Sequence, residues 1–259
     1  MRHIAPNCGD YCQKMREKGY LCKNICFMAH IFFEKQGKLS DMITLYPNLL
    51  HTLPRFDISL GFGNKTIAEV CEKNGVNPDF FLLICNVYSF DDYLPSKQEL
   101  ATVDMSQLVT YLEKSHRYYL DKRISHIQHH MNRIVGMLQD RRIGEVLSNF
   151  MEVYRGEVEE HFSYEEQNVY AHLTKLQQGI PDTTYSIAHF ISSHGNLQEK
   201  LEDLTQIIFK YLPAQMSAED DAIEVVFDLL QLSRDLKKHS LIEEKIMVPY
   251  VMQLERRVK

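Results

Sequence analysis

The sequence contains the stretch HFSYEEQ at residues 161–167 and a second stretch, HSLIEEK, at residues 239–245. In each, a histidine is followed four residues later by a glutamate, so on a helix both side chains lie on one face, one turn apart. Apolar residues such as Leu147, Tyr154 and Val158 continue this face at steps of three and four. Each stretch therefore indicates a polar interruption in the apolar face of a long amphipathic helix.

The same periodicity predicts four long helices in the C-terminal part of the chain. Their expected ranges are about 105–139, 143–176, 184–211 and 220–255, with short turns that contain Gly179, Pro181 and Pro213. No alternating pattern typical of strands competes with them. Four helices of similar length with short connections predict an all-α fold, an up-down-up-down four-helix bundle.

Each predicted helix carries polar residues on its inward face. The first and third contribute one imidazole each, and the second and fourth contribute a His/Glu pair. The helical rise places these groups within about 7 Å of one height. Burying them without a cation would cost on the order of several kcal/mol per unpaired charge, so we expect a metal centre. Its expected ligands are His116, His161, Glu165, His194, His239 and Glu243.

The ligand types favour iron. Imidazoles and carboxylates suit redox-active iron, and their alternation implies two ions, each bound by two histidines and bridged by Glu165 and Glu243. This leaves room for an oxo or hydroxo bridge and for a diatomic ligand. Zinc and manganese also agree with the spacing. A ferritin-like site is disfavoured, because it uses Glu-x-x-His pairs.

Four motifs resemble those of the hemerythrin-type di-iron domain of the repair-of-iron-centres family. Residues 45–90 are similar to that family's small N-terminal helical domain, so the resemblance covers about 215 residues. It implies that the six residues above bind iron, and that the protein restores iron–sulfur clusters damaged by nitric oxide or peroxide. The motifs are EKSH ending at His116, HFSYEEQ from His161, SSH ending at His194, and HSLIEE from His239, with Val248-Pro249 beyond it.

Two functions stay open from this resemblance. In the first, a di-iron stress-response protein acts on damaged iron–sulfur proteins and reacts with nitric oxide or oxygen, with or without a nitric oxide reductase-type activity. In the second, the centre is a sensor or binding module for oxygen or nitric oxide without repair activity. The family usually has adjacent cysteines after an aspartate, whereas Asp57 here is followed by Ile58-Ser59-Leu60, which favours the second function somewhat. Iron storage is disfavoured by the carboxylate-poor site.

The chain divides by composition into three parts. Residues 1–38 carry seven Lys or Arg against three Asp or Glu, and we interpret them as an arm with reduced thiols; a metal site or a stapled helical hairpin is the alternative. Residues 39–92 predict a small helical domain, with a helix that begins at Pro78 after Asn77, and residues 93–259 predict the bundle domain. Cys71 and Cys85 are expected to be buried. The arm cysteines are Cys8, Cys12, Cys22 and Cys26.

Net charge and hydropathy limit the kinds of partner that the sequence predicts. The net charge of -6 argues against nucleic acid as a main partner. An uncharged run near the N-terminus, residues 25–33, is too short to span a membrane. We therefore expect a cytoplasmic protein with neither nucleic-acid nor membrane partners, and a homodimer is left open.

Several further polar residues have two interpretations. His126 and His130 are four residues apart and, with His129, could form a second metal patch, although a solvated helix surface is the simpler interpretation. The roles of His172 and His189 stay open. Glu166 and Glu244 are expected to face outward, because each lies about 100° around the helix from its neighbouring ligand. Tyr154, Tyr164, Phe162 and Phe190 are interpreted as core, with lining of access to the centre as the alternative.

Overall fold

The computed structural model describes residues 33–193, 197–213 and 220–258. The four cysteines of the N-terminal arm therefore lie outside the described residues. Residues 33–259 group into one compact unit. Within the described ranges, helices are the only regular elements apart from one isolated β-bridge between Lys38 and Thr66. The all-α prediction is confirmed.

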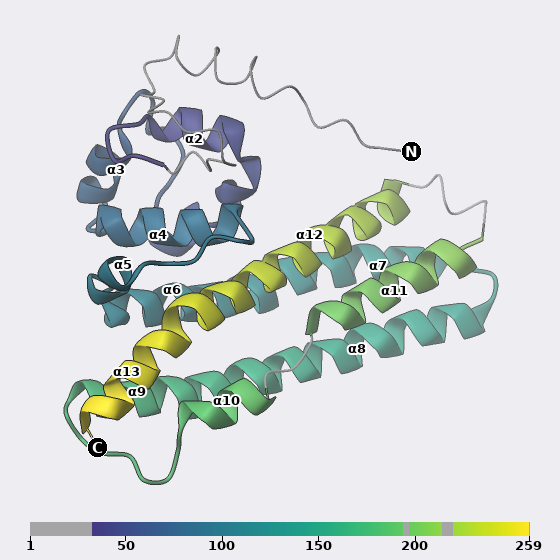
Figure 1. Ribbon diagram of the computed structural model, residues 1–259. Helices are drawn as coiled ribbons and strands as arrows, with labels where there is room; N and C mark the ends of the chain where they lie inside the picture. The colour runs from purple at the N-terminus through teal and green to yellow at the C-terminus, as the bar shows by residue number, and fades with distance from the viewer. Residues whose placement is uncertain (1–32, 194–196, 214–219, 259) are drawn as a thin grey trace, which may run out of the picture. The chain divides into compact units, whose positions relative to one another are not determined.

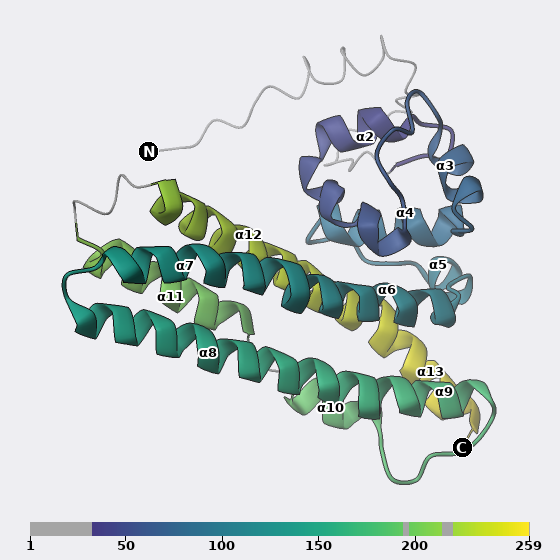
Figure 2. The ribbon, with the colours of Figure 1, turned by 180° about the vertical axis from the view of Figure 1, so that it is seen from behind.

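Four antiparallel rods form the bundle (Figures 1 and 2). The helices α7 and α11 each contact both α8 and α12, which closes the bundle. The predicted ends of the four rods differ from the observed ends by at most three residues. The last rod, for example, was expected to end at residue 255 and ends at Val258. The rods are α6 (Met105–Arg117), η3 (Tyr118–Ile124) and α7 (Ser125–Met137); α8 (Arg141–Tyr164), η4 (Glu165–Tyr170) and α9 (Ala171–Gln177); α10 (Ile187–Ser193) and α11 (Leu197–Tyr211); and α12 (Asp220–Ile242), η5 (Glu243–Met247) and α13 (Val248–Val258).

Short helices precede the bundle. As predicted, Asn77 starts α4: its side-chain oxygen accepts hydrogen bonds from the backbone N–H groups of Asp79 at 2.8 Å and Phe80 at 3.3 Å. Helix α4 contacts α12, and η2 contacts α6. Cys71 and Cys85 are free and buried, as expected. These helices are α2 (Leu39–Leu45), η1 (Pro47–His51), η2 (Leu53–Phe56), α3 (Ile67–Lys73), α4 (Pro78–Ser89) and α5 (Lys97–Ala101).

The buried apolar residues form two clusters. One contains the short N-terminal helices together with the end of the bundle made by α6, α9 and α13. The other fills the opposite end, between α7, α8, α11 and α12. The boundary falls between Leu112 and Tyr119 on the first rod and between Phe162 and Val169 on the second. A polar layer therefore separates the two halves of the core.

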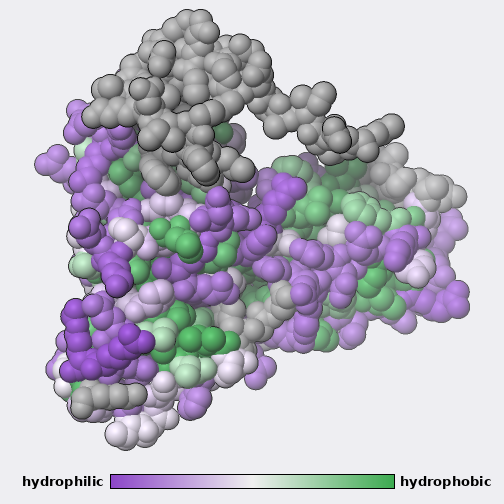
Figure 3. Space-filling view, viewed as in Figure 1, coloured by the Kyte–Doolittle hydropathy of each residue, from purple (hydrophilic) through white to green (hydrophobic). Residues whose placement is uncertain are grey.

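The outer surface is mixed. Hydrophilic residues cover much of the face shown in Figure 3, with apolar patches between them. Large apolar side chains exposed on α11 and α12 include Phe209, Ile223 and Phe227. Among the described helices, none combines the length and the apolar character that crossing a membrane requires.

A buried ion pair joins the short N-terminal helices to the bundle. The Arg55 guanidinium on η2 donates to the Asp235 carboxylate on α12 at 2.5 Å, and Tyr88 donates to the other carboxylate oxygen at 2.7 Å. The rings of Tyr118 and Tyr119 each lie 5.0 Å from the guanidinium carbon, within cation–π range. Burial acts to raise the pKa of Asp235, but the charge of Arg55 holds it below its ordinary value.

We expect Arg55→Met to lower the free energy of unfolding by about 3–5 kcal/mol, because it leaves the Asp235 carboxylate buried without a cation. The double variant Arg55→Met/Asp235→Asn should lose clearly less, since no uncompensated charge remains and the amide oxygen can still accept from Tyr88. Urea unfolding followed by circular dichroism measures both. A single variant within about 1 kcal/mol of the parent protein would contradict a structural role for this pair.

Candidate metal centre

Four of the six predicted ligands meet in the polar layer. His116 lies in the last turn of α6 and His239 in the last turn of α12, while Glu165 and Glu243 are the first residues of η4 and η5. One possible ligand atom from each lies within 4.8 Å of the others. Both carboxylates are 0% exposed. The structure thus brings together groups that are far apart in the sequence. Their burial is energetically costly unless a cation lies among them.

A π-helical segment follows the site residue on three of the rods. The segments η4 and η5 begin at Glu165 and Glu243, and η3 begins two residues after His116. A π-turn holds one residue more than an α-turn, so it rotates the side chains that follow it. The buried residues of the first rod show this shift, because Tyr119 is followed by Ile124 five residues later. Such segments occur frequently at functional sites.

The distances connect imidazoles to carboxylates and to each other. The Nε2 atoms of His116 and His239 are 3.2 Å apart. The two oxygens of Glu165 face different imidazoles: Oε2 lies 3.1 Å from Nε2 of His116, and Oε1 lies 3.0 Å from Nε2 of His161. On the fourth rod, Oε1 of Glu243 lies 3.2 Å from Nε2 of His239.

These spacings fit a shared cation. Ligand atoms bound at about 2.1 Å lie about 3.0 Å apart at right angles and about 3.4 Å apart at tetrahedral angles. The observed separations of 3.0–3.2 Å match the lower part of that range. Two imidazole nitrogens and two carboxylates also form a donor set that suits iron or another transition metal.

Glu166 supports His116 from behind. Its Oε1 lies 2.9 Å from Nδ1 of His116, so the imidazole donates its Nδ1 proton there and turns Nε2 toward the centre. Carboxylates behind ligating histidines have this role in many metal sites. Glu166 faces outward as expected, with a side chain that is 44% exposed, and its carboxylate still reaches His116 on the first rod.

The ionisation of the site residues follows from these contacts. Burial acts to lower the pKa of His116, but the hydrogen bonds to Glu165 and Glu166 outweigh it and raise the pKa to about 9. Burial and the nearby His116 lower the pKa of His239 well below its ordinary value. For His161, the bond to Glu165 outweighs burial and raises the pKa.

Aromatic rings enclose the imidazoles. The Phe162 ring stacks on His116 with centroids 3.9 Å apart and planes 5° from parallel. The Tyr119 ring lies edge-on to His239 at 5.6 Å, and the Tyr170 hydroxyl lies 3.4 Å from Nε2 of His116. Of these three, the sequence pointed only to Phe162. These rings exclude water from the side of the site that they cover.

A cavity of about 300 Å³ lies beside the site. His161, Phe162 and His239 contribute to its wall, together with Leu197 and Leu236. Its size is ample for a diatomic molecule, and the imidazoles of two candidate ligands line it.

The other two predicted ligands are His161 and His194. His161 lies on α8 beside Glu165 and is partly exposed, with a side chain 17% accessible. It is not one of the four residues that cluster most closely. His194 lies outside the described residues. The ligand set of six therefore stays a prediction, of which the structure places five members.

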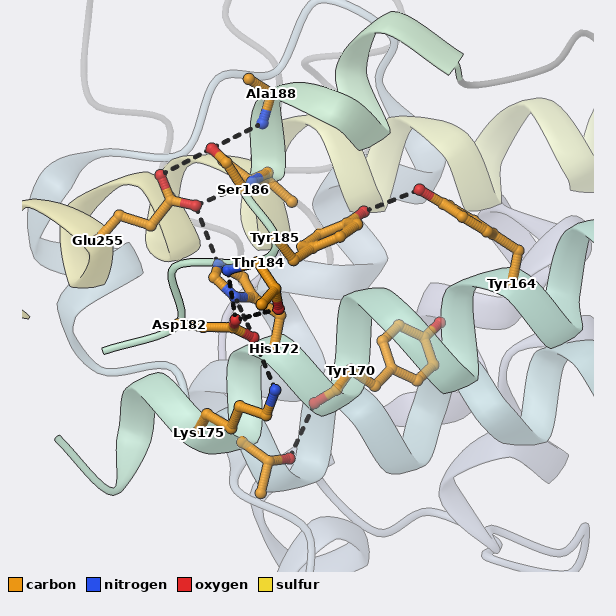
Figure 4. A network of polar contacts seen from close by, with 12 residues as sticks. Tyr164, Tyr170, His172, Lys175, Asp182, Thr184, Tyr185, Ser186, Ala188 and Glu255 are labelled. Carbon is orange, nitrogen blue, oxygen red and sulfur yellow. Dashed lines mark hydrogen bonds and ion pairs between the residues drawn. The ribbon is translucent and has the colours of Figure 1, made fainter. Parts of the chain in front are cut away.

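His172 does not belong to the centre. Its Nδ1 lies 3.3 Å from Asp182 and its Nε2 lies 3.0 Å from Glu255, and Glu255 also accepts from the backbone N–H of Ile187 at 2.8 Å (Figure 4). This network fastens the turn between α9 and α10 to α13. His189 packs edge-on against Tyr185 at 5.7 Å.

Comparison with protein-family models identifies a related domain. A family model described as Hemerythrin HHE cation binding domain matches residues 107–251. A search of curated proteins found no match. The matched range contains all six predicted ligands and excludes the short helices before α6.

We expect Glu166→Gln to weaken metal binding about 10- to 100-fold, because it removes the charge that fixes the orientation of the His116 ring. Glu244→Gln is the matched control: Glu244 also directly follows a candidate ligand, but it forms no hydrogen bond to a histidine in the described ranges. Competition with a chelator of known affinity measures both. Equal affinities in the two variants would contradict the supporting role of Glu166.

We expect metal binding at pH 7.5 to release about one proton from His116, because a pKa of about 9 keeps this imidazole charged until its Nε2 accepts a metal. His239 should add none, since its lowered pKa leaves it neutral, whereas the raised pKa of His161 acts to increase the release. Anaerobic calorimetry with ferrous iron in buffers of different ionisation enthalpy counts the protons. The count should fall above pH 9, and a count that stays constant to pH 10 would contradict this assignment.

Proposed function

Since the chain belongs to the hemerythrin HHE cation-binding domain family, we propose that it holds a di-iron centre that serves the repair of damaged iron–sulfur clusters. The observation that carries the proposal is the convergence of buried imidazoles on two buried carboxylates in the layer between the two apolar clusters. The proposed ligands are His116, His161, Glu165, His194, His239 and Glu243.

The geometry supports two ions rather than one. His116 and His239 face each other through Nε2, as two ligands of a single ion would. The two oxygens of Glu165 face different imidazoles, as a carboxylate that bridges two ions would. His161 would then bind the second ion together with His194.

The surrounding residues have separate tasks in this proposal. Glu166 holds the proton on Nδ1 of His116, and the rings of Phe162 and Tyr119 exclude water. The cavity beside His161 admits a diatomic molecule. Two iron ions bound here would supply redox chemistry toward nitric oxide or oxygen.

The assignment to cluster repair rests on the four motifs that resemble the repair-of-iron-centres family, and a cytoplasmic location would accompany it. Short helices precede the bundle, in agreement with the resemblance of residues 45–90 to the N-terminal part of that family. The partners would be proteins with iron–sulfur clusters damaged by nitric oxide or peroxide.

We expect the purified full chain to bind about two iron ions and to show an oxo-bridged diferric absorption band that changes on addition of nitric oxide. Glu165→Ala and Glu243→Ala should each lose iron, because each removes a candidate bridging ligand. Glu160→Ala, a change on the exposed surface of α8, is the control and should keep the iron. Metal analysis together with Mössbauer spectroscopy measures these outcomes, and a stable content of one zinc per chain would refute the di-iron centre.

Repair is tested by adding catalytic amounts of the iron-loaded protein to an iron–sulfur enzyme inactivated by nitric oxide. Recovery of activity supports the proposal, with the Glu165→Ala variant as a negative control. Failure of recovery in a protein that still binds nitric oxide would overturn repair and support a binding or sensor module.

A further inference from the structure

A second pair of imidazoles lies on the surface of the bundle. His126 and His130 are one turn apart on α7, and their Nε2 atoms are 3.3 Å apart. The side chain of His126 is 52% exposed and that of His130 is 18% exposed. His126 follows His116 by ten residues, which corresponds to roughly 15 Å along the rod. The pair is therefore distinct from the buried centre and open to solvent.

Both imidazoles are held from behind by carboxylates of α12. Nδ1 of His126 lies 2.7 Å from Asp228, and Nδ1 of His130 lies 2.7 Å from Asp221. Arg123 pairs with Asp228 at 3.0 Å, and Arg133 pairs with Asp221 at 3.1 Å. A carboxylate paired with arginine is ionised and only accepts hydrogen bonds, so each imidazole carries a proton on Nδ1.

The proton on Nδ1 determines the chemical state of the two Nε2 atoms. A neutral imidazole with its proton on Nδ1 has a lone pair on Nε2. Two such lone pairs that face each other at 3.3 Å repel, unless a proton or a metal ion lies between them. The spacing falls within the 3.0–3.4 Å that two ligands of one ion adopt at bonds of about 2.1 Å.

We propose that His126 and His130 form a second metal site, which binds a divalent transition-metal ion through the two Nε2 atoms. Imidazole nitrogen suits zinc, copper and nickel. Asp228 and Asp221 act behind the ligands, as Glu166 does behind His116. Two protein ligands leave the remaining positions to water, so the ion can exchange with solvent. His129 is not a member of the pair, since its ring lies perpendicular to that of His130 at 5.5 Å.

The test is calorimetric titration of the iron-loaded full chain with nickel(II). We expect one nickel ion that depends on the pair: the double variant His126→Asn/His130→Asn loses it and keeps its iron. His129→Asn, on the same helix, should bind nickel like the parent protein. Asp228→Asn, checked for folding by circular dichroism, should bind it about 10- to 100-fold more weakly.

The proposal is independent of iron at the buried centre, because nickel binding and iron content are measured separately. If the double variant binds nickel with the stoichiometry and affinity of the parent protein, the proposal is overturned. The pair then shares a proton and not a metal. Loss of iron together with nickel in the double variant would also overturn it, since the two sites would not be separate.

Discussion

The burial of two carboxylates within an apolar bundle is the constraint on which this structure depends. Glu165 and Glu243 are inaccessible to solvent, and apolar clusters close the bundle on both sides of them. Removing such charges from water is costly unless positive groups surround them closely. The rods therefore have to present imidazoles at this height, and residues from three of them do so within a few ångströms. The polar layer fixes the register of the rods as well as the place of the chemistry.

Much of this arrangement could be predicted from the sequence, and the failures have physical reasons. Apolar steps of three and four residues predicted the rods. Their polar interruptions predicted a cluster of six ligands, of which the structure brings four within 4.8 Å of one another: His116, Glu165, His239 and Glu243. The π-helical segments were missed, because that periodicity assumes α-helical turns throughout. The contact of the exposed Glu166 with His116 could not be predicted either, because it joins two rods at positions 50 residues apart. The Arg55–Asp235 pair links positions 180 residues apart, and no periodic pattern in the sequence indicates it. His194, outside the described residues, stays a prediction.

The chain uses one arrangement twice, in surroundings of different polarity. In both places, two imidazoles face each other through Nε2 at 3.2–3.3 Å, with a carboxylate behind Nδ1 of His116, His126 and His130. In the core, aromatic rings and buried glutamates surround the pair, which favours tight retention of an ion. On the surface, water reaches the pair, which favours exchange. The difference arises from position along the same rods, because His116 and His126 belong to one continuous helical run.

The ion pair between Arg55 and Asp235 couples the short N-terminal helices to the bundle, so the two are expected to unfold together. Asp235 lies one helical turn before His239, and the charge of Arg55 contributes to the potential at that imidazole. The family match begins at residue 107, after Arg55 and Tyr88. A fragment cut at that border would keep the Asp235 carboxylate but lose its counterion, its phenol donor and the short helices that cover it. The family match therefore begins later in the chain than the residues that neutralise the buried charge of the bundle.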